Sequence, residues 1–238
     1  MPVLYARDPN SRLSAKRQVD RRTMPSPAVR ASAHRNVAQH KVRIAVWDTH
    51  SQFPALSSTL ERINEAQTVF DFEIVDLSVP VDTWHMEENK RYLDADWFAE
   101  RLAPQISQIG FHYMSAIVDE WMACDLGTKK PQYDIYGWWP SPEKPPVLIF
   151  STKELALEPK GPATDHAIAN VAVRGIASYM GEASHDKPPR DCPNYYNSQR
   201  KLEVLTGRQK FCKPCADKLR AAHPEEFKAL NLILAAFD

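Results

Sequence analysis

The chain has 238 residues, of which 43% are hydrophobic and 25% are charged, and its formal net charge at pH 7 is zero. This length allows one sizeable hydrophobic core, with or without a flexible extension. No stretch reaches the roughly eighteen uninterrupted apolar residues of a membrane helix, and the N-terminus lacks the apolar region of a secretory signal. We therefore expect a soluble cytoplasmic protein with no membrane partner.

Residues 1–41 carry a large share of the positive charge. They hold nine Lys or Arg against two Asp, which leaves 21 basic and 28 acidic residues in the rest of the chain. With few large apolar side chains, they cannot bury enough surface to offset their ordering entropy. We predict a flexible basic arm over 1–41 and a folded domain over 42–238. The arm binds nucleic acid or an acidic protein surface, or has no partner, or acts as a transit peptide.

Strands and helices alternate through the first two thirds of the domain. Apolar and β-branched runs predict strands over 41–48, 68–79, 113–119 and 145–151, and apolar spacing predicts helices over 53–66 and 94–109. Pro104 should kink or end the second helix. Residues 120–146 are rich in Pro and aromatic side chains, which predicts a long irregular segment. The alternation predicts an α/β or α+β domain with a mixed, twisted sheet.

The most informative element is a helix predicted over 163–181. Its apolar residues recur at helical intervals, Thr164 or Asp165 can cap its start, and Gly181 can end it in the left-handed conformation. The opposite face carries a polar stripe of Asn170, Arg174, Ser178 and Glu182.

Three of the four cysteines lie close to the C-terminus. Cys212 and Cys215 form a C-x-x-C pair, which lets two thiolates from one turn reach the same tetrahedral ion, and Cys192 can supply a third ligand. His185 is the nearest soft donor for the fourth position, with the nearby Asp residues as alternatives. We predict a single structural zinc in a region spanning 185–215, held by His185, Cys192, Cys212 and Cys215. The competing interpretations are a redox pair and metal-free thiols.

The C-terminal half resembles the archaemetzincin family of zinc metallopeptidases, whose signature runs H-E-x-x-H-x-x-G-x-x-H-C-x4-C-x-M-x17-C-x-x-C. This chain offers Cys192, one residue, Asn194, seventeen residues, and then Cys212 and Cys215, which reproduces the spacing of the tail. The resemblance covers roughly residues 43–222 and implies a metzincin-like fold with an active-site-type helix. The interval from His185 to Cys192 is two residues longer than in the family.

The same resemblance implies that the catalytic positions are degenerate. With the family's glycine on Gly181, Arg174 replaces the first histidine and Gly175 the general-base glutamate. Ser178 and Ser184 then replace the other two histidines, and Asn194 replaces the methionine beneath the metal. A guanidinium has no lone pair for a metal. We interpret Arg174 either as a site that attracts a carboxylate or as a filler that pairs with Glu182 or another acid.

These patterns predict a catalytically inactive, metallopeptidase-like protein that retains a structural zinc and serves as a protein-binding or scaffold subunit. The alternatives are a nucleic-acid-associated factor that uses residues 1–41 and an atypical metal-dependent peptidase. The aromatic residues of 133–139 either line a cleft or anchor their own loop, and an apolar helix over 224–237 closes the chain.

Overall fold

A computed structural model describes residues 41–81, 84–87, 89–125, 130–139, 144–158, 160–182, 184–195 and 201–238, without the side chains of 84–86. The predicted arm therefore lies outside the described residues, apart from Lys41. Among the described residues, no helix has both the length and the apolar character needed to cross a membrane.

The main sheet is mostly parallel. Four parallel strands, β1 (Val42–Asp48), β2 (Phe70–Ile74), β5 (Tyr113–Val118) and β9 (Val147–Ser151), are joined at one edge by the short antiparallel strand β8 (Gly137–Trp138), in the order β2-β1-β5-β9-β8. Most residues of these strands are buried on both faces, as expected for a parallel sheet covered by helices. The four strands predicted from apolar runs are thus confirmed, although the second is shorter than expected.

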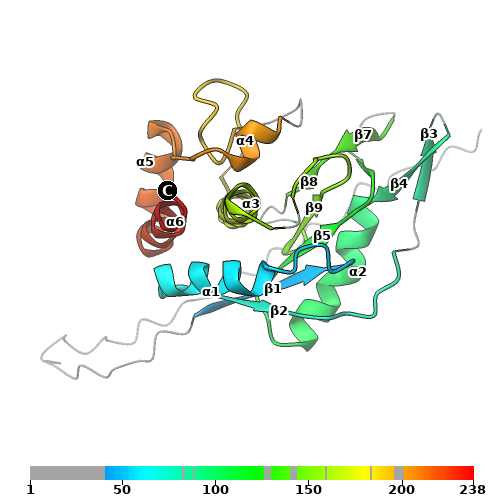
Figure 1. Cartoon of the computed structure of the whole chain (residues 1–238), viewed down its shortest axis with the longest axis horizontal. Coiled ribbons are helices and arrows are strands. Elements are labelled where there is room, and N and C mark those ends of the chain that lie inside the picture. Colours follow the sequence, from blue (N-terminus) through cyan, green and yellow to red (C-terminus); the bar gives the residue numbers. More distant parts are fainter. Residues whose placement is uncertain are drawn as a thin grey trace, which may run out of the picture. The chain divides into compact units, whose positions relative to one another are not determined.

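Helices cover both faces of this sheet (Figure 1). One face, which includes Ile44 and Val46, packs against α1 (Leu56–Ala66), α3 (Pro162–Tyr179) and α6 (Pro224–Ala236). The other face, which includes Ala45 and Trp47, packs against α2 (Ala95–Gln108). Because successive side chains of a strand point to opposite faces, each strand contributes to both cores. The predicted α/β class, with its mixed sheet and active-site-type helix, is confirmed.

A second sheet was not predicted. It comprises β3 (Trp84–Glu87), β4 (Lys90–Asp94), β6 (Met122–Cys124) and β7 (Gln132–Ile135) in the order β3-β4-β6-β7. Two of these strands, and β8 of the main sheet, lie within 120–146, so the prediction of an irregular segment there was wrong. The strands are short, and Asp134 within β7 adopts the left-handed conformation (φ 58°) where the pairing of β7 with β6 shifts register.

Two helix boundaries also differ from expectation. Helix α2 continues through Pro104 to Gln108, because Pro104 is exposed and the carbonyl that it leaves unpaired, that of Glu100, also lies on an exposed residue. Helix α3 begins at Pro162 after Gly161, so neither Thr164 nor Asp165 is its N-cap. Its end is as predicted. Gly181 has φ 93°, and the bonds Glu182 N to Ala177 O (3.0 Å) and Gly181 N to Ser178 O (2.9 Å) close a Schellman turn.

Candidate metal centre

The polar stripe of α3 is buried beneath the C-terminal part of the chain. Asn170, Arg174, Ser178 and Glu182 are each less than 10% exposed, although they lie on the face opposite the sheet. Asn170 donates to the carbonyls of Leu205 and Gly207, at and after α4 (Leu202–Thr206), at 2.7 and 2.9 Å. Glu182 pairs with Lys218 of α5 (Lys213–Ala222) at 3.5 Å. Polar contacts therefore dock the C-terminal region on this helix.

Four soft donors meet beside this stripe. His185 follows the turn after α3, Cys192 lies on the next loop, Cys212 is the N-cap of α5, and Cys215 lies in its first turn. One ligand atom from each of these residues can be chosen so that all four lie within 4.8 Å of one another. Around a tetrahedral zinc with Zn–S near 2.3 Å, ligand atoms are separated by roughly 3.5 to 3.8 Å. The cluster therefore fits one zinc ion after a small contraction.

The ring of His185 is oriented by its own backbone segment. Its Nδ1 lies 2.8 Å from the Lys187 carbonyl, and its Nε2 lies 3.6 Å from the Cys212 sulfur. A carbonyl can only accept a hydrogen bond, so Nδ1 carries the proton and the lone pair of Nε2 faces the thiols. A hydrogen bond of this kind fixes the ring of a metal-binding histidine.

The surroundings of the thiols disfavour thiolates unless a cation is bound. Burial raises the pKa of Cys192 and of Cys215, and the neighbouring Cys212 thiol raises the pKa of Cys215 further. In the opposite direction, the backbone N–H groups of Cys212 (3.4 Å) and Asn194 lower the pKa of Cys192. The N-terminus of α5 adds its positive dipole end. Thiolates in this cluster therefore need a bound cation, and zinc is the cation that this donor set suits best.

The redox interpretation fits less well. Cys212 follows a loop, without the preceding strand of a thioredoxin-like redox motif. Cys124 lies apart in the core of the second sheet, where burial and then the Asp96 carboxylate raise its pKa to about 11. Cys124 is thus an ordinary core thiol.

Arg174 fills the position that the resemblance gives to the first catalytic histidine. Its guanidinium is buried, donates to the carbonyls of Pro193 (3.0 Å) and Tyr195 (2.6 Å) and to the hydroxyl of Ser184 (2.7 Å), and lies 4.2 Å from the Trp139 ring centroid. It does not pair with Glu182, so that form of the filler interpretation is wrong.

Gly175 is required by close packing. A Cβ atom at this position would overlap the Tyr113 hydroxyl and lie 2.7 Å from a Leu148 methyl carbon. The Tyr113 side chain is buried, its hydroxyl has no hydrogen-bond partner among the described residues, and burial raises its pKa well above the usual value. A side chain at position 175 therefore requires Tyr113 and Leu148 to shift.

The other positions that the resemblance assigns to the catalytic site also belong to the packing. Ser178 is buried on α3, and Ser184 accepts a hydrogen bond from Arg174. Asn194 is 1% exposed, and its side chain lowers the pKa of Cys215. Its carbonyl accepts from the His185 amide at 2.9 Å.

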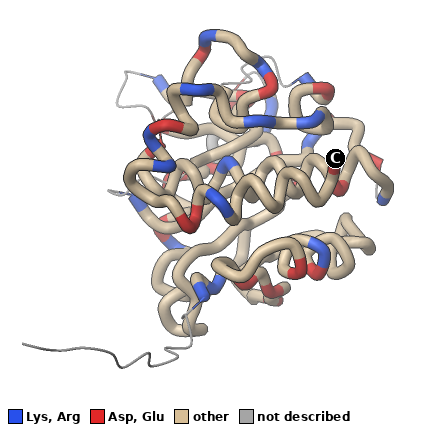
Figure 2. The backbone as a smooth tube through the Cα atoms, turned by 90° about the vertical axis from the view of Figure 1, so that its left-hand side faces the viewer, with Lys and Arg blue, Asp and Glu red and all other residues tan. Residues whose placement is uncertain are grey.

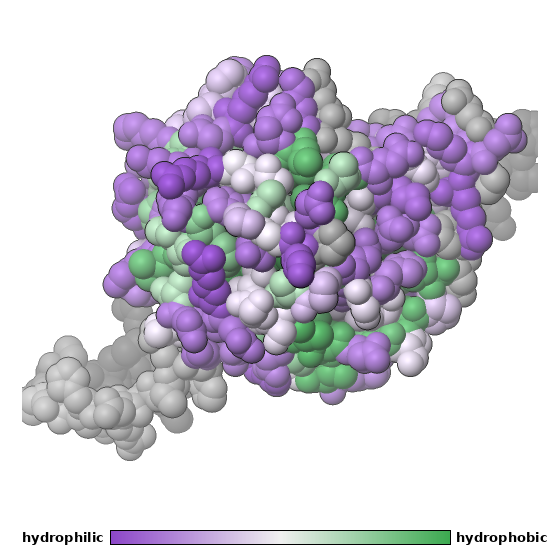
Figure 3. All heavy atoms as spheres, viewed as in Figure 1, coloured by the Kyte–Doolittle hydropathy of each residue, from purple (hydrophilic) through white to green (hydrophobic). Residues whose placement is uncertain are grey.

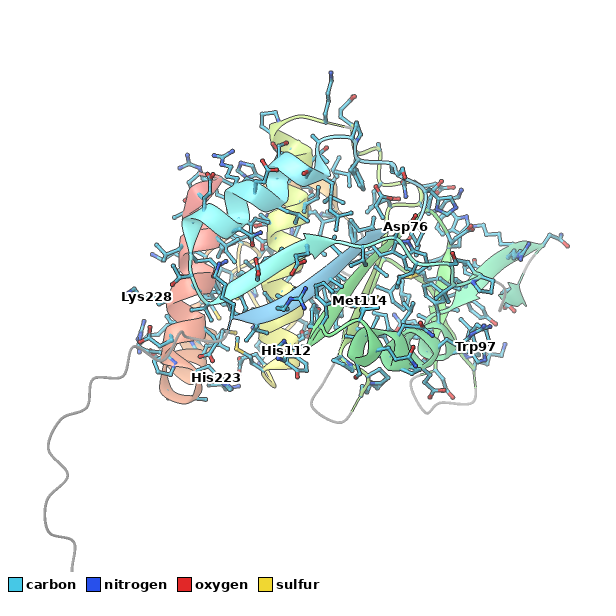
Figure 4. The ribbon with its side chains drawn as sticks, turned by 90° about the horizontal axis from the view of Figure 1, so that it is seen from below. Asp76, Trp97, His112, Met114, His223 and Lys228 are labelled. Atoms are coloured by element: carbon cyan, nitrogen blue, oxygen red, sulfur yellow. The ribbon has the colours of Figure 1, made fainter. Side chains whose placement is uncertain are left out.

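The described residues leave little free space beside Arg174. The cavity there has a volume of about 10 Å³, which is close to the space of one water molecule. Trp139 forms one of its walls, while Tyr136 and Trp138 are buried in the core, so the aromatic segment both lines this space and anchors itself. A larger cavity of about 170 Å³ lies at the C-terminal end of α3, where Ile176, Tyr179 and His223 line it; Figure 4 labels His223.

Other polar clusters have structural partners. His166 packs against the Phe237 ring, and Asp165 accepts a hydrogen bond from Thr59 at 2.6 Å. Asp119 lies 3.7 Å from Lys153. The side chain of His85, which could be read as a metal ligand, lies outside the described residues.

With this geometry, the fold can be compared with known proteins. No family model and no curated protein sequence matches the chain. Among solved structures, the archaemetzincin of Methanopyrus kandleri has a TM-score of 0.55 and 13% identity, over 80% of this chain and 98% of that one. A zinc-dependent peptidase from Methanocorpusculum labreanum (strain Z) has a TM-score of 0.52 and 16% identity, over 74% of this chain and 99% of that one.

The chain therefore has a metallopeptidase-like fold of the archaemetzincin type, as the spacing of its cysteines implied. At this level of identity the likeness establishes the fold alone. The functional residues have to be judged from the chain's own donors and packing.

Removing one thiol tests the metal cluster. Cys212→Ser or Cys215→Ser should lower the zinc content of the purified protein from one per chain to nearly none, and amide exchange should become fast from about residue 185 onward. Structural zinc is worth about 10 to 16 kcal/mol in small domains, which exceeds what such a segment can lose and stay folded. Cys124→Ala removes a buried thiol elsewhere and should retain the zinc. Retention of zinc by all three variants would argue against the cluster.

A second test concerns Gly175. Gly175→Ala should destabilise the protein by about 1 to 3 kcal/mol in urea unfolding, because the added methyl group overpacks the space held by Tyr113 and Leu148. Alanine is otherwise favoured over glycine inside a helix by up to about 1 kcal/mol, so a stabilised variant would disprove the close approach. Tyr113→Phe removes the hydroxyl that the new methyl group would overlap. Gly175→Ala should therefore cost less stability in a Tyr113→Phe protein than in the parent protein.

Proposed function

We propose that this chain is a catalytically inactive, metallopeptidase-like protein that retains one structural zinc and works by binding another protein. The zinc is held by His185, Cys192, Cys212 and Cys215 and ties the region 185–215 to the start of α5. Metal-binding thiols suit a reducing compartment, and we propose the cytoplasm.

The observation that carries this proposal is the environment of Arg174. Metal-dependent hydrolysis of a peptide needs three lone-pair ligands, an open position for water and a general base. Arg174 offers a permanent cation in place of a ligand, and its donors are engaged by two carbonyls and a hydroxyl. A carboxylate side chain at position 175 would collide with Tyr113 and Leu148 unless both moved. These two positions therefore supply neither the metal ligand nor the base of such a mechanism.

Binding without cleavage is the use that the fold retains. The cavity beside Arg174 is too small for a peptide side chain, so we propose that a partner protein contacts the outer surface. The face of the molecule seen in Figure 3 is mostly hydrophilic, with patches of apolar residues among the polar ones. Such a mixture is typical of transient interfaces.

Nucleic-acid binding is a second proposal, and it rests on the arm. Residues 1–41 carry nine basic residues against two acidic ones. Over the described chain, Lys and Arg are interspersed with Asp and Glu (Figure 2). Phosphate contacts, if the protein makes them, would therefore fall mainly on the arm.

Metal analysis of the full-length protein tests the main proposal. We expect one zinc per chain by elemental analysis and no cleavage of unstructured peptide substrates with or without added zinc, because the second set of ligands is missing. Two zinc ions per chain together with chelator-sensitive cleavage would overturn the proposal and favour an atypical peptidase.

Deletion of the arm tests the second proposal. If residues 1–41 bind phosphates, the full chain should bind duplex DNA or RNA with an affinity that falls steeply between about 50 and 200 mM salt, and a chain of residues 42–238 should lose that binding. The shortened chain should keep its zinc and its melting temperature. Equal binding by both chains would place the contacts elsewhere.

A further inference from the structure

Two of the four zinc donors lie on segments that are bonded directly to Arg174. Ser184, which accepts from one end of the guanidinium at 2.7 Å, immediately precedes His185. Pro193, whose carbonyl accepts from the other end at 3.0 Å, immediately follows Cys192. A single side chain on α3 therefore reaches the neighbours of both donors.

The two segments are also joined to each other around Asn194. The His185 amide donates to the Asn194 carbonyl at 2.9 Å, and the Tyr195 amide donates to the Cys192 carbonyl at 2.9 Å. Arg174 donates to the carbonyls of Pro193 and Tyr195, on either side of this residue. The guanidinium thus holds the turn on which both donors depend.

The geometry of this contact suits arginine in particular. One nitrogen of its planar fork serves two carbonyls, the other serves the Ser184 hydroxyl, and the Trp139 ring packs at 4.2 Å. A lysine ammonium is a compact point charge and cannot spread its donors in this way. The helix that carries Arg174 is buried along most of its length and gives the fork a rigid base.

We propose that Arg174 is a positioning residue for the zinc ligands His185 and Cys192, an inference that rests on the proposed zinc site. The residue at the place of a catalytic histidine supports the structural metal from outside its ligand shell. Its positive charge also favours the bound site, in which three thiolates and one dication leave a net negative charge.

The test uses the full-length, zinc-loaded protein and two variants, Arg174→Met and Arg174→Lys. Zinc affinity is measured by competition with a chromophoric chelator, and zinc release is followed in time. We expect about 10- to 100-fold weaker binding for Arg174→Met, as is typical when an outer partner of a metal ligand is removed. Arg174→Lys should fall between the parent and Arg174→Met, because it keeps the charge and loses the fork.

Arg43→Met is the control. Arg43 also donates to a backbone carbonyl, that of Gly110 at 3.1 Å, and also lies over an aromatic ring, Phe111 at 4.3 Å, but it belongs to β1, is partly exposed and pairs with Glu73 at 2.8 Å. It should lower stability without changing zinc affinity. The visible spectrum of the cobalt-substituted protein gives a second readout, since a displaced ligand alters the tetrahedral cobalt bands.

The outcomes separate the two proposals. Unchanged zinc affinity and an unchanged cobalt spectrum in Arg174→Met would overturn the positioning role and leave the zinc site intact. A parent chain that binds no zinc would instead overturn the proposed function. If Arg174→Met does not fold, Ser184→Ala removes one of the three bonds at an exposed residue and should speed zinc release about two- to tenfold; an unchanged rate would count against the role.

Discussion

A buried cation organises the C-terminal half of this protein. Removing a guanidinium from water costs several kcal/mol unless its donors are satisfied. Arg174 meets that cost with two backbone carbonyls, a hydroxyl and an aromatic face. Those acceptors come from a loop that has no regular secondary structure of its own. The loop thus supplies polar groups that replace water around Arg174, and these contacts hold the arginine in one orientation.

The polar stripe of α3 and the cysteine cluster both stabilise the segment between α3 and α5. The described residues between α3 and α5, 184–195 and 201–212, contain one short helix and few buried apolar side chains, so the hydrophobic effect alone gives this region little stability. Asn170 and Arg174 bind its backbone carbonyls, and the donor cluster can cross-link its two ends through a metal. Hydrogen bonds to α3 and a metal cross-link then stabilise this region. Segments too small to form a hydrophobic core are commonly stabilised by such cross-links.

Much of the fold could be predicted from the sequence, for clear physical reasons. Buried parallel strands appear as apolar runs, and α3 shows helical spacing with a glycine that only the left-handed turn explains. The second sheet could not be predicted, because its strands have three to five residues and lie among prolines and aromatic side chains. The helix α5 was also missed, since its apolar residues are few and its first turn carries the cysteines. The four donors could be grouped by spacing, whereas the acceptors of Arg174 could not, because they are backbone carbonyls with no signature in sequence.

The packing around Arg174 and Gly175 opposes a metal ligand and a carboxylate at these two positions. Histidine at position 174 would remove the donors that the carbonyls of Pro193 and Tyr195 now accept from, and would leave the buried carbonyl of Pro193 without that partner. Glutamate at position 175 would demand that Tyr113 and Leu148 move, and both belong to the main core. Each of these substitutions alone would therefore lower the stability of the fold.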